Sequence, residues 1–156
     1  MTREIERKFL VRGEQWRSLS DEGCFVRQGY LATGANSSVR VRVAGRGAWI
    51  CVKGATVGVS RPEFEYRVPL ADAEEMLGRL CEGPLIEKTR YRVSVGDHVW
   101  EIDVFHGDNA GLVVAEVELG GDDEHFLRPD WIGEEVSHDP RYYNACLSRH
   151  PYREWS

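Results

Sequence analysis

The chain has 156 residues and a mass of 17.8 kDa, a size that one domain with a single core accounts for. Twenty Lys and Arg residues against 26 Asp and Glu residues leave a net charge of −6, which excludes a protein whose whole surface binds nucleic acid. The mean hydropathy of −0.45, without a long apolar segment, excludes a membrane-spanning class. We expect one cytoplasmic domain over residues 1–156, with neither nucleic acid nor membrane as a partner.

Eight segments alternate apolar and polar residues with a period of two, as half-buried β-strands do. In chain order they are residues 3–11, 25–31, 38–44, 48–53, 63–68, 86–94, 98–105 and 112–119. Short joints such as Gly45-Arg46-Gly47 and Gly96-Asp97 suit hairpin turns rather than helical crossovers. A mainly antiparallel sheet is therefore predicted.

Helices are few in this pattern. A short helix over 14–19 follows the first strand, and a second, capped by Asp72, has an apolar stripe and ends before Gly83-Pro84. An acidic run favours a third helix over 122–127. The last helix is expected to begin at Asp139-Pro140 and to stop before Pro151.

Charge, not Ser or Thr, occupies the polar face of the predicted strands. In SVRVRV, Arg40 and Arg42 share one face and the valines share the other. Across all strands the polar faces carry eight acids and eight bases: Glu4, Glu6, Glu63, Glu65, Glu101, Asp103, Glu116 and Glu118; Lys8, Arg40, Arg42, Lys53, Arg67, Lys88, Arg90 and Arg92. The arrangement fits either an open sheet with a solvated face or a closed barrel with a charged lumen.

Like charges stand two residues apart on one strand at six places, for example Arg90/Arg92 and Glu116/Glu118. Their repulsion brings no structural return, whereas a ligand inside a barrel would supply one. A barrel of about eight strands holds its own side chains and one small ligand. Paired carboxylates without Cys or His partners favour Mg²⁺ or Mn²⁺, and clustered Arg and Lys favour phosphate oxygens.

Cysteine and histidine chemistry contributes little to this interpretation. Cys24, Cys51, Cys81 and Cys146 form no CxxC pair, so we expect reduced, structural thiols. Cys51, beside Lys53, is a single weak candidate for a nucleophile. The five histidines fall in predicted turns, in a surface helix or beside the last helix, and the Gly-rich turns lack the phosphate-binding GxxxxGK pattern.

The ordered charged motifs resemble those of the CYTH superfamily, the triphosphate tunnel metalloenzymes. They run from Glu4-Ile5-Glu6-Arg7-Lys8 (ExExK) through SVRVRV, ICVKG, PEFEYRV, IEKTRYRV and WEIDVF to AEVEL, followed by a tail, EVSHDPRYYNACL, similar to the last helix of short bacterial members. The resemblance implies a closed eight-stranded antiparallel barrel with a charged lumen and a few flanking helices. It also implies action on a small anionic triphosphate with Mg²⁺ or Mn²⁺.

Length and the early ExExK strand look most like the short bacterial tripolyphosphatases, which implies hydrolysis of inorganic tripolyphosphate to pyrophosphate and phosphate. A class IV-type adenylyl cyclase and a thiamine triphosphatase on the same fold stay as alternatives. A non-catalytic polyphosphate-binding module is an alternative of another class. Apolar residues on the barrel exterior that the helices leave uncovered would allow a homodimer.

The resemblance also assigns residues to roles. Glu4, Glu6, Glu116 and Glu118 match metal-binding carboxylates, joined by Glu65 and Asp103. Lys8, Arg40, Arg42, Lys53, Arg90 and Arg92 match triphosphate-binding residues, and Lys88 is placed where it would neutralise the departing phosphate. The catalytic group is Lys8, Glu63, Glu65, Lys88 and Asp103, in which the acids would hold a second metal that activates water. Tyr30 and the last helix receive no role.

Overall fold

The computed structural model describes residues 2–155, and these form nine strands, two short α-helices and four 3₁₀ turns. The strands are β1 (Thr2–Val11), β2 (Cys24–Thr33), β3 (Ser37–Ala44), β4 (Gly47–Gly54), β5 (Ser60–Arg67), β6 (Glu82–Val95), β7 (His98–Phe105), β8 (Val113–Glu118) and β9 (Ile132–Glu135). The helices are α1 (Leu70–Arg79) and α2 (Asn144–Leu147). The 3₁₀ turns are η1 (Gln15–Leu19), η2 (Gly107–Asn109), η3 (Pro140–Tyr142) and η4 (Tyr152–Glu154).

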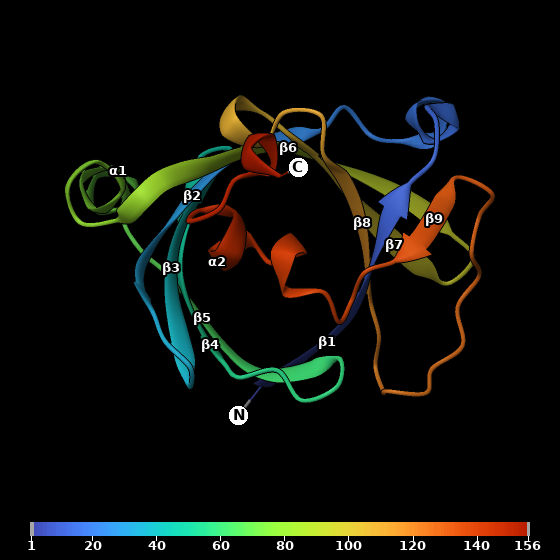
Figure 1. Ribbon diagram of the computed structural model, residues 1–156, viewed down its shortest axis with the longest axis horizontal. Helices are drawn as coiled ribbons and strands as arrows, with labels where there is room; N and C mark the ends of the chain where they lie inside the picture. The colour runs from blue at the N-terminus through green and yellow to red at the C-terminus, as the bar shows by residue number, and fades with distance from the viewer. Residues whose placement is uncertain (1, 156) are drawn as a thin grey trace.

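Eight of the strands close into a barrel. Their order around the ring is β5-β4-β3-β2-β6-β7-β8-β1, and β1 returns to pair with β5, every pairing being antiparallel. Figure 1 looks into this ring, with α1 outside the wall and the C-terminal segment (residues 136–155, which contain η3, α2 and η4) across the opening. The predicted closed eight-stranded barrel is confirmed, and the open sheet is excluded.

The strand β9 was not predicted. It pairs with the end of β1, where Phe9 faces Glu135 and Val11 faces Ile132. Four residues, Ile-Gly-Glu-Glu, are too few for alternation to identify a strand, and a glycine among them weakens the pattern further. This strand exists because β1 offers it an edge, which is tertiary information.

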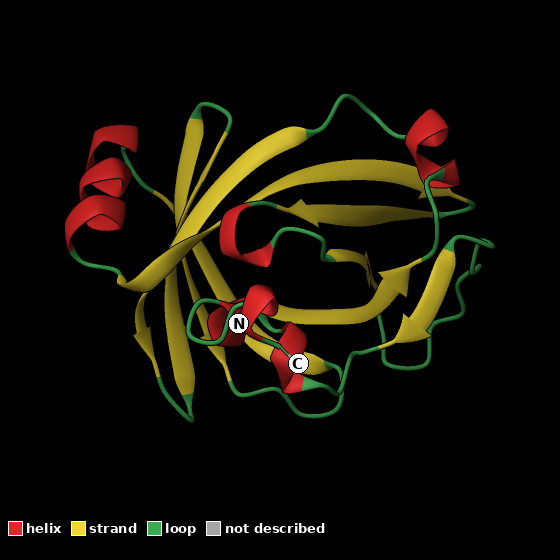
Figure 2. Cartoon of the chain, turned by 45° about the horizontal axis from the view of Figure 1, so that its top comes forward, coloured by secondary structure: helices red, strands yellow, loops and turns green. Residues whose placement is uncertain are grey.

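The helix α1 lies on the outer face of β2, β3 and β4, as Figure 2 shows at one side of the barrel. Its buried Ala73 and Leu77 pack on Val41, Val43 and Ala48. It begins at Leu70 behind Pro69, so Asp72 is not its cap but lies in the first turn, where an acidic side chain suits the helix dipole.

No helix in residues 2–155 is long and apolar enough to cross a membrane.

The helix α1 ends before Gly83-Pro84, as expected. It stops at Arg79, and Gly83 and Pro84 already belong to β6. Gly83 has a φ of 69°, a conformation that side chains rarely adopt, and it starts the strand rather than ending the helix.

The helix predicted over 122–127 is absent, and this segment has no regular secondary structure. Glu124 accepts a hydrogen bond from the Gly120 amide and pairs with His98, so its carboxylate stabilises a loop instead of a helix start. Phe126 packs edge-on against Phe9 and Trp100. The outer face of the barrel is thus covered here by a loop, where we expected a helix.

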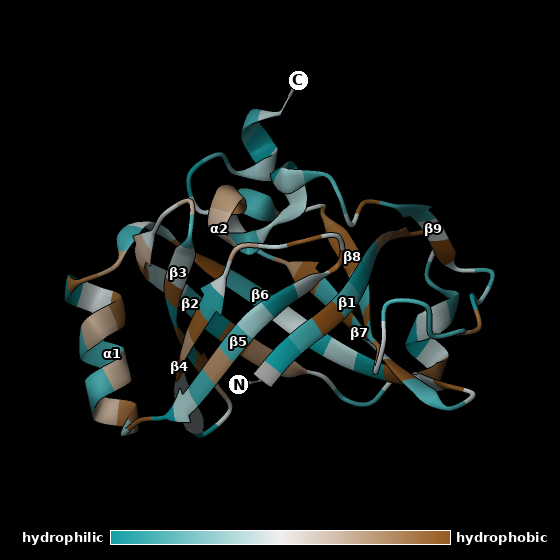
Figure 3. Ribbon diagram, turned by 90° about the horizontal axis from the view of Figure 1, so that it is seen from below, coloured by the Kyte–Doolittle hydropathy of each residue, from teal (hydrophilic) through white to brown (hydrophobic). Residues whose placement is uncertain are grey.

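The last predicted helix is broken into two pieces, η3 and α2, and η4 follows beyond its expected end at Pro151. Asp139 caps η3 as expected, because its side chain accepts from the Arg141 amide and Pro140 takes the first position. Tyr143 then has extended backbone and separates η3 from α2. Figure 3 shows α2 and the C-terminus together over one end of the barrel.

The largest apolar core lies outside the barrel wall, on β1, β6, β7 and β8. Phe9 is 0% exposed and contacts the ring of Trp100 with centroids 5.5 Å apart. Phe9→Ala is expected to lower the free energy of unfolding in urea by about 3–5 kcal/mol, because it removes a large buried ring and leaves a cavity. Phe25→Ala, at a side chain that is 50% exposed, is the matched control and should cost about 1 kcal/mol or less. Equal losses in the two variants would contradict this account of the core.

Candidate functional site

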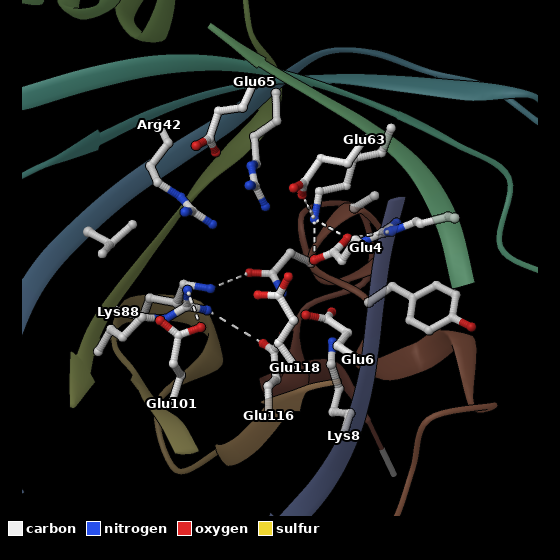
Figure 4. A pocket seen from close by; sticks show the side chains of 18 of the residues that line it. Glu4, Glu6, Lys8, Arg42, Glu63, Glu65, Lys88, Glu101, Glu116 and Glu118 are labelled. Atoms are coloured by element: carbon white, nitrogen blue, oxygen red, sulfur yellow. Dashed lines mark hydrogen bonds and ion pairs between the residues drawn. The ribbon is translucent and has the colours of Figure 1, made fainter. Parts of the chain in front are cut away.

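A cavity of about 470 Å³ fills the middle of the barrel. The predicted site residues that line it are Glu4, Glu6, Lys8, Arg40, Arg42, Lys53, Glu63, Glu65, Lys88, Arg90, Arg92, Glu116 and Glu118. Figure 4 shows side chains from many strands converging on this space. The two-residue period explains the convergence, because every second side chain of each strand faces inward. Asp103 also points inward, but it lies behind Lys88 and Arg90, which it contacts.

Depth in the cavity follows the bases of β6. Lys88 is 1% exposed, whereas the side chain of Arg90 is 15% exposed and that of Arg92 is 65% exposed. Arg92 therefore stands at the open mouth rather than in the lumen, where it pairs with Glu101 at 3.5 Å. A charged ligand would enter past Arg92 and reach Lys88 last.

The other end of the lumen is closed and apolar. Ile86, Phe105 and Val114 occupy inward positions next to the charged residues of β6, β7 and β8, and they pack against Tyr142 and Leu147 of the C-terminal segment. The sequence pattern placed only charges inside, so this apolar end corrects the prediction. The site is a cup with one open mouth.

Carboxylates gather on β1 and β8. In the strand register Glu6 faces Glu118 and Lys8 faces Glu116. Burial raises the pKa of Glu6, and the neighbouring Glu116 and Glu4 raise it further. Burial also opposes ionisation of Glu116, but Lys8 and Arg90 outweigh it and hold its pKa well below the usual range.

This crowding is what an electropositive ligand would relieve. The donors are all carboxylate oxygens, the kind that hard divalent cations prefer. Among residues 2–155 no three acidic, His or Cys side chains are already arranged around a common metal position. The carboxylates fit such a cation in their chemistry, with some rearrangement of their present contacts.

Glu4 has cationic partners instead. Lys53 Nζ donates to its two oxygens at 2.7 and 3.0 Å, and Arg61 Nε donates at 3.0 Å. Burial disfavours the charged form of Glu4, yet Lys53 and Arg61 hold its pKa well below the usual range. Glu63 also reaches Lys53, at 3.2 Å. Arg61 was missed in the sequence, although it shares the parity of Glu63, because the predicted strand began three residues too late.

Asp103 is saturated by cations. Arg90 donates to both of its oxygens, at 2.7 and 2.9 Å, and Lys88 Nζ lies 2.7 Å from Oδ2. The sequence interpretation grouped Asp103 with the metal ligands; in the structure these two bases hold its carboxylate, and Arg90 also lies 3.5 Å from Glu116. Asp103 holds Lys88 and Arg90 of β6 in position.

Lys88 is the deepest base. Burial lowers its pKa to about 7, with Arg90 and Arg42 adding to the decrease and Asp103 opposing it. Its ammonium group also donates to Asn144 Oδ1 at 3.0 Å. The ammonium is therefore held between β7 and the C-terminal segment.

Arg40 and Arg42 face the cavity from β3. Arg40 is 6% exposed, and its Nε has no hydrogen-bond partner among the described residues. A buried guanidinium nitrogen without an acceptor is costly, which makes it a site prepared for an anion. Burial and the adjacent Arg40 lower the pKa of Arg42 to about 10, so both still carry charge at neutral pH.

Several lining residues were not foreseen, among them Arg61, Ser137, Tyr143 and Asn144. Gln28 was also not foreseen; it is fully buried and bonds to Asn144, and it has the parity of Tyr30, which lines the cavity, so the alternation of β2 could have indicated both. No sequence pattern points to Ser137, Tyr143 or Asn144, because they reach the lumen only through the broken C-terminal segment.

Cys51 offers little as a nucleophile. Its side chain is buried beside Glu63 Oε2 at 3.8 Å. Burial raises the pKa of this thiol, so the reactive thiolate is disfavoured. The four cysteines are free thiols, as expected.

Comparison with known proteins agrees with this geometry. Similar chains include an inorganic triphosphatase of Acetivibrio thermocellus, 46% identical over 155 residues that cover 99% of both chains. An inorganic triphosphatase of Nitrosomonas europaea is 39% identical over 149 residues, or 93% of this chain and 96% of that one.

Solved structures repeat the fold. The crystal structure of the inorganic triphosphatase NE1496 superposes with a TM-score of 0.65 at 36% identity, over 92% of this chain and 96% of that one. A Hippeastrum protein described as a candidate adenylyl cyclase with a dominant triphosphatase activity gives a TM-score of 0.61 at 12% identity, over 76% and 80% of the two chains. At that identity the likeness concerns the fold alone. The CYTH domain family matches residues 2–143, which include all eight strands of the barrel and its charged lumen, and the chain belongs to this family.

Proposed function

We propose that this protein hydrolyses inorganic tripolyphosphate with a divalent metal, Mg²⁺ or Mn²⁺. Water adds to a terminal phosphorus, the terminal phosphoanhydride bond breaks, and the products are phosphate and pyrophosphate. One observation carries the proposal, a one-mouthed cavity of about 470 Å³ whose wall combines clustered bases with clustered carboxylates. The two similar chains named inorganic triphosphatase, nearly full-length matches, support the same substrate.

The bases would bind the phosphate chain. Arg40 and Arg42 present guanidinium groups from β3, and Arg90 presents one from β6 on the other side of β2. Their planar donors match phosphate oxygens in pairs, and Lys8 and Lys53 add point charges. Fixed positive charge also stabilises the negative charge that develops on the leaving phosphate.

The carboxylates Glu6, Glu116 and Glu118 would hold the metal, with Glu4 beside them. A bound divalent metal supplies Lewis acidity toward phosphate oxygens and lowers the pKa of its water. Glu63 and Glu65 face the same cavity from β5 and stay candidates for a second metal. Asp103 acts instead by holding Lys88 and Arg90.

Lys88 is the residue best placed to move a proton at the closed end. With a pKa of about 7, its Nζ exchanges a proton near neutral pH at little cost. The charged form neutralises the departing phosphate. A binding module without catalysis would need neither this lysine nor the crowded acids.

A substrate panel tests the function. Purified protein with Mg²⁺ or Mn²⁺ should release phosphate from tripolyphosphate, and excess EDTA should abolish the release. ATP and thiamine triphosphate should react with at least about tenfold lower kcat/KM, because most of the lumen wall consists of charged groups that suit phosphates. Chromatography of the ATP reaction identifies the cyclase alternative. Cyclic AMP as the main product, or phosphate release indifferent to EDTA, would contradict the proposal.

A further inference from the structure

Asn144 joins the C-terminal segment to two bases of the lumen. It is the first residue of α2 and lines the cavity. Its Oδ1 accepts from Lys88 Nζ at 3.0 Å and from Gln28 Nε2 at 2.8 Å. Gln28 is 0% exposed, and its Oε1 accepts from Arg42 Nε at 3.2 Å. Arg42, Gln28, Asn144 and Lys88 thus form one continuous hydrogen-bonded chain.

The direction of every bond in this chain is determined by its ends. Lysine and arginine only donate, so Oδ1 of Asn144 and Oε1 of Gln28 must be the acceptors. Neither amide can rotate by half a turn without setting a donor against a donor. Both are held by the barrel wall and by the C-terminal segment at once.

Lys88 depends on this chain for its orientation. Its ammonium has Asp103 Oδ2 on one side at 2.7 Å and Asn144 Oδ1 on another at 3.0 Å, above the ring of Phe105 at 5.5 Å. A lysine side chain has a flexible four-carbon stem. With Asp103 as its single acceptor, the ammonium group would be free to rotate about the Lys88–Asp103 contact. Two acceptors define the direction in which the remaining N–H points.

Tyr142 and Tyr143, adjacent to Asn144, hold a second base. Lys8 Nζ donates to the Tyr142 carbonyl at 3.2 Å and lies 5.7 Å from the centre of the Tyr143 ring. The extended backbone at Tyr143, which interrupts the predicted helix, is what lets three successive residues serve different sides of the lumen. The break in the helix therefore brings Tyr142, Tyr143 and Asn144 into contact with Lys8 and Lys88.

We propose that Asn144 is a positioning residue for catalysis, which orients Lys88 directly and Arg42 through Gln28. The C-terminal segment is then part of the active site as well as its cover. This role rests on the proposed triphosphatase function. Asn144 contacts Lys88 directly and Arg42 only through Gln28, so its removal affects the chemical step that needs Lys88 more than substrate binding.

A double-mutant cycle tests the role. Asn144→Leu is expected to lower kcat for tripolyphosphate by about 10-fold to 30-fold, with KM changed less than about threefold. In a Lys88→Met background, measured at high enzyme concentration, the same substitution should change the residual rate by less than about twofold. Cys146→Ala, on the same helix and away from both bases, is the control and should leave kcat unchanged. Circular dichroism of each variant checks that it is folded.

Asn144→Asp provides a second variant. It keeps an oxygen acceptor for Lys88 and adds a negative charge near the phosphates, so KM should rise while kcat stays within about threefold of the wild-type value. If the Asn144→Leu protein does not fold, the different effects of Asn144→Asp on KM and on kcat test the positioning role. Additive losses in the cycle, or a kcat for Asn144→Asp as low as for Asn144→Leu, would overturn the role in an active enzyme. A wild-type protein without phosphate release would overturn the function and the role together.

Discussion

Arg40→Ala is expected to lower kcat/KM for tripolyphosphate by at least about 100-fold. Arg40 is buried in the lumen, and its Nε has no hydrogen-bond partner within residues 2–155. Because Arg40 Nε lacks a hydrogen-bond acceptor, the site is complementary to an anion. Alanine removes both the charge and the planar donors of the guanidinium group. Initial rates of phosphate release over a range of tripolyphosphate concentrations measure the loss.

Two further variants define what Arg40 contributes. Arg40→Lys keeps the positive charge but lacks the planar set of N–H donors of a guanidinium group. It should recover about tenfold of the lost kcat/KM. Arg46→Ala changes the same residue type in the exposed β3–β4 turn and should leave the rate unchanged. An Arg40→Ala enzyme with wild-type rates would show that the substrate does not occupy this wall of the barrel.

Glu6→Gln is expected to separate activity from stability. Glu6 is crowded by Glu116 and Glu4, and burial together with these neighbours raises its pKa. Removing its charge should weaken Mn²⁺ binding by at least about tenfold and lower the rate by at least about 100-fold, because a carboxylate ligand is lost. The metal-free variant should melt a few degrees higher than the wild type at pH 8, which corresponds to about 1 kcal/mol.

Calorimetric titration with Mn²⁺ and thermal unfolding followed by circular dichroism provide the two readouts. Glu75→Gln on α1, at a side chain that is 63% exposed, is the matched control. Its ion pair with Arg79 lies at the surface and is worth little, so metal affinity, rate and melting temperature should all stay as in the wild type. A destabilised Glu6→Gln protein that still binds Mn²⁺ normally would mean that Glu6 serves the fold and not a metal.

Local patterns were reliable wherever a strand was long enough to show its period. Arg40 and Arg42, or Glu116 and Glu118, face one side of their strands because side-chain direction alternates along any extended backbone. The prediction failed at the ends of this pattern. Arg61 precedes the expected start of its strand, and β9 is too short to show alternation at all.

Helix patterns were less reliable because they compete with tertiary contacts. The acidic start at residues 122–124 would suit a helix, but Phe126 finds its partners in Phe9 and Trp100, and the chain stays irregular to reach them. After Asp139 the helix begins as expected and breaks at Tyr143, where the backbone turns toward the lumen. The apolar stripe of α1 agreed with its packing, since Ala73 and Leu77 face the barrel.

By itself the sequence determined which side of each strand carries charge, and the motif order identified the family. The charged faces are local, since side-chain direction depends on neighbours two residues apart. Only the tertiary structure decided which charges meet. It assigned Asp103 to Lys88 and Arg90, closed one end of the barrel with apolar side chains, and brought Asn144 to Gln28 across 116 residues of chain. Contacts over that separation arise from barrel closure and packing, and no short-range pattern encodes them.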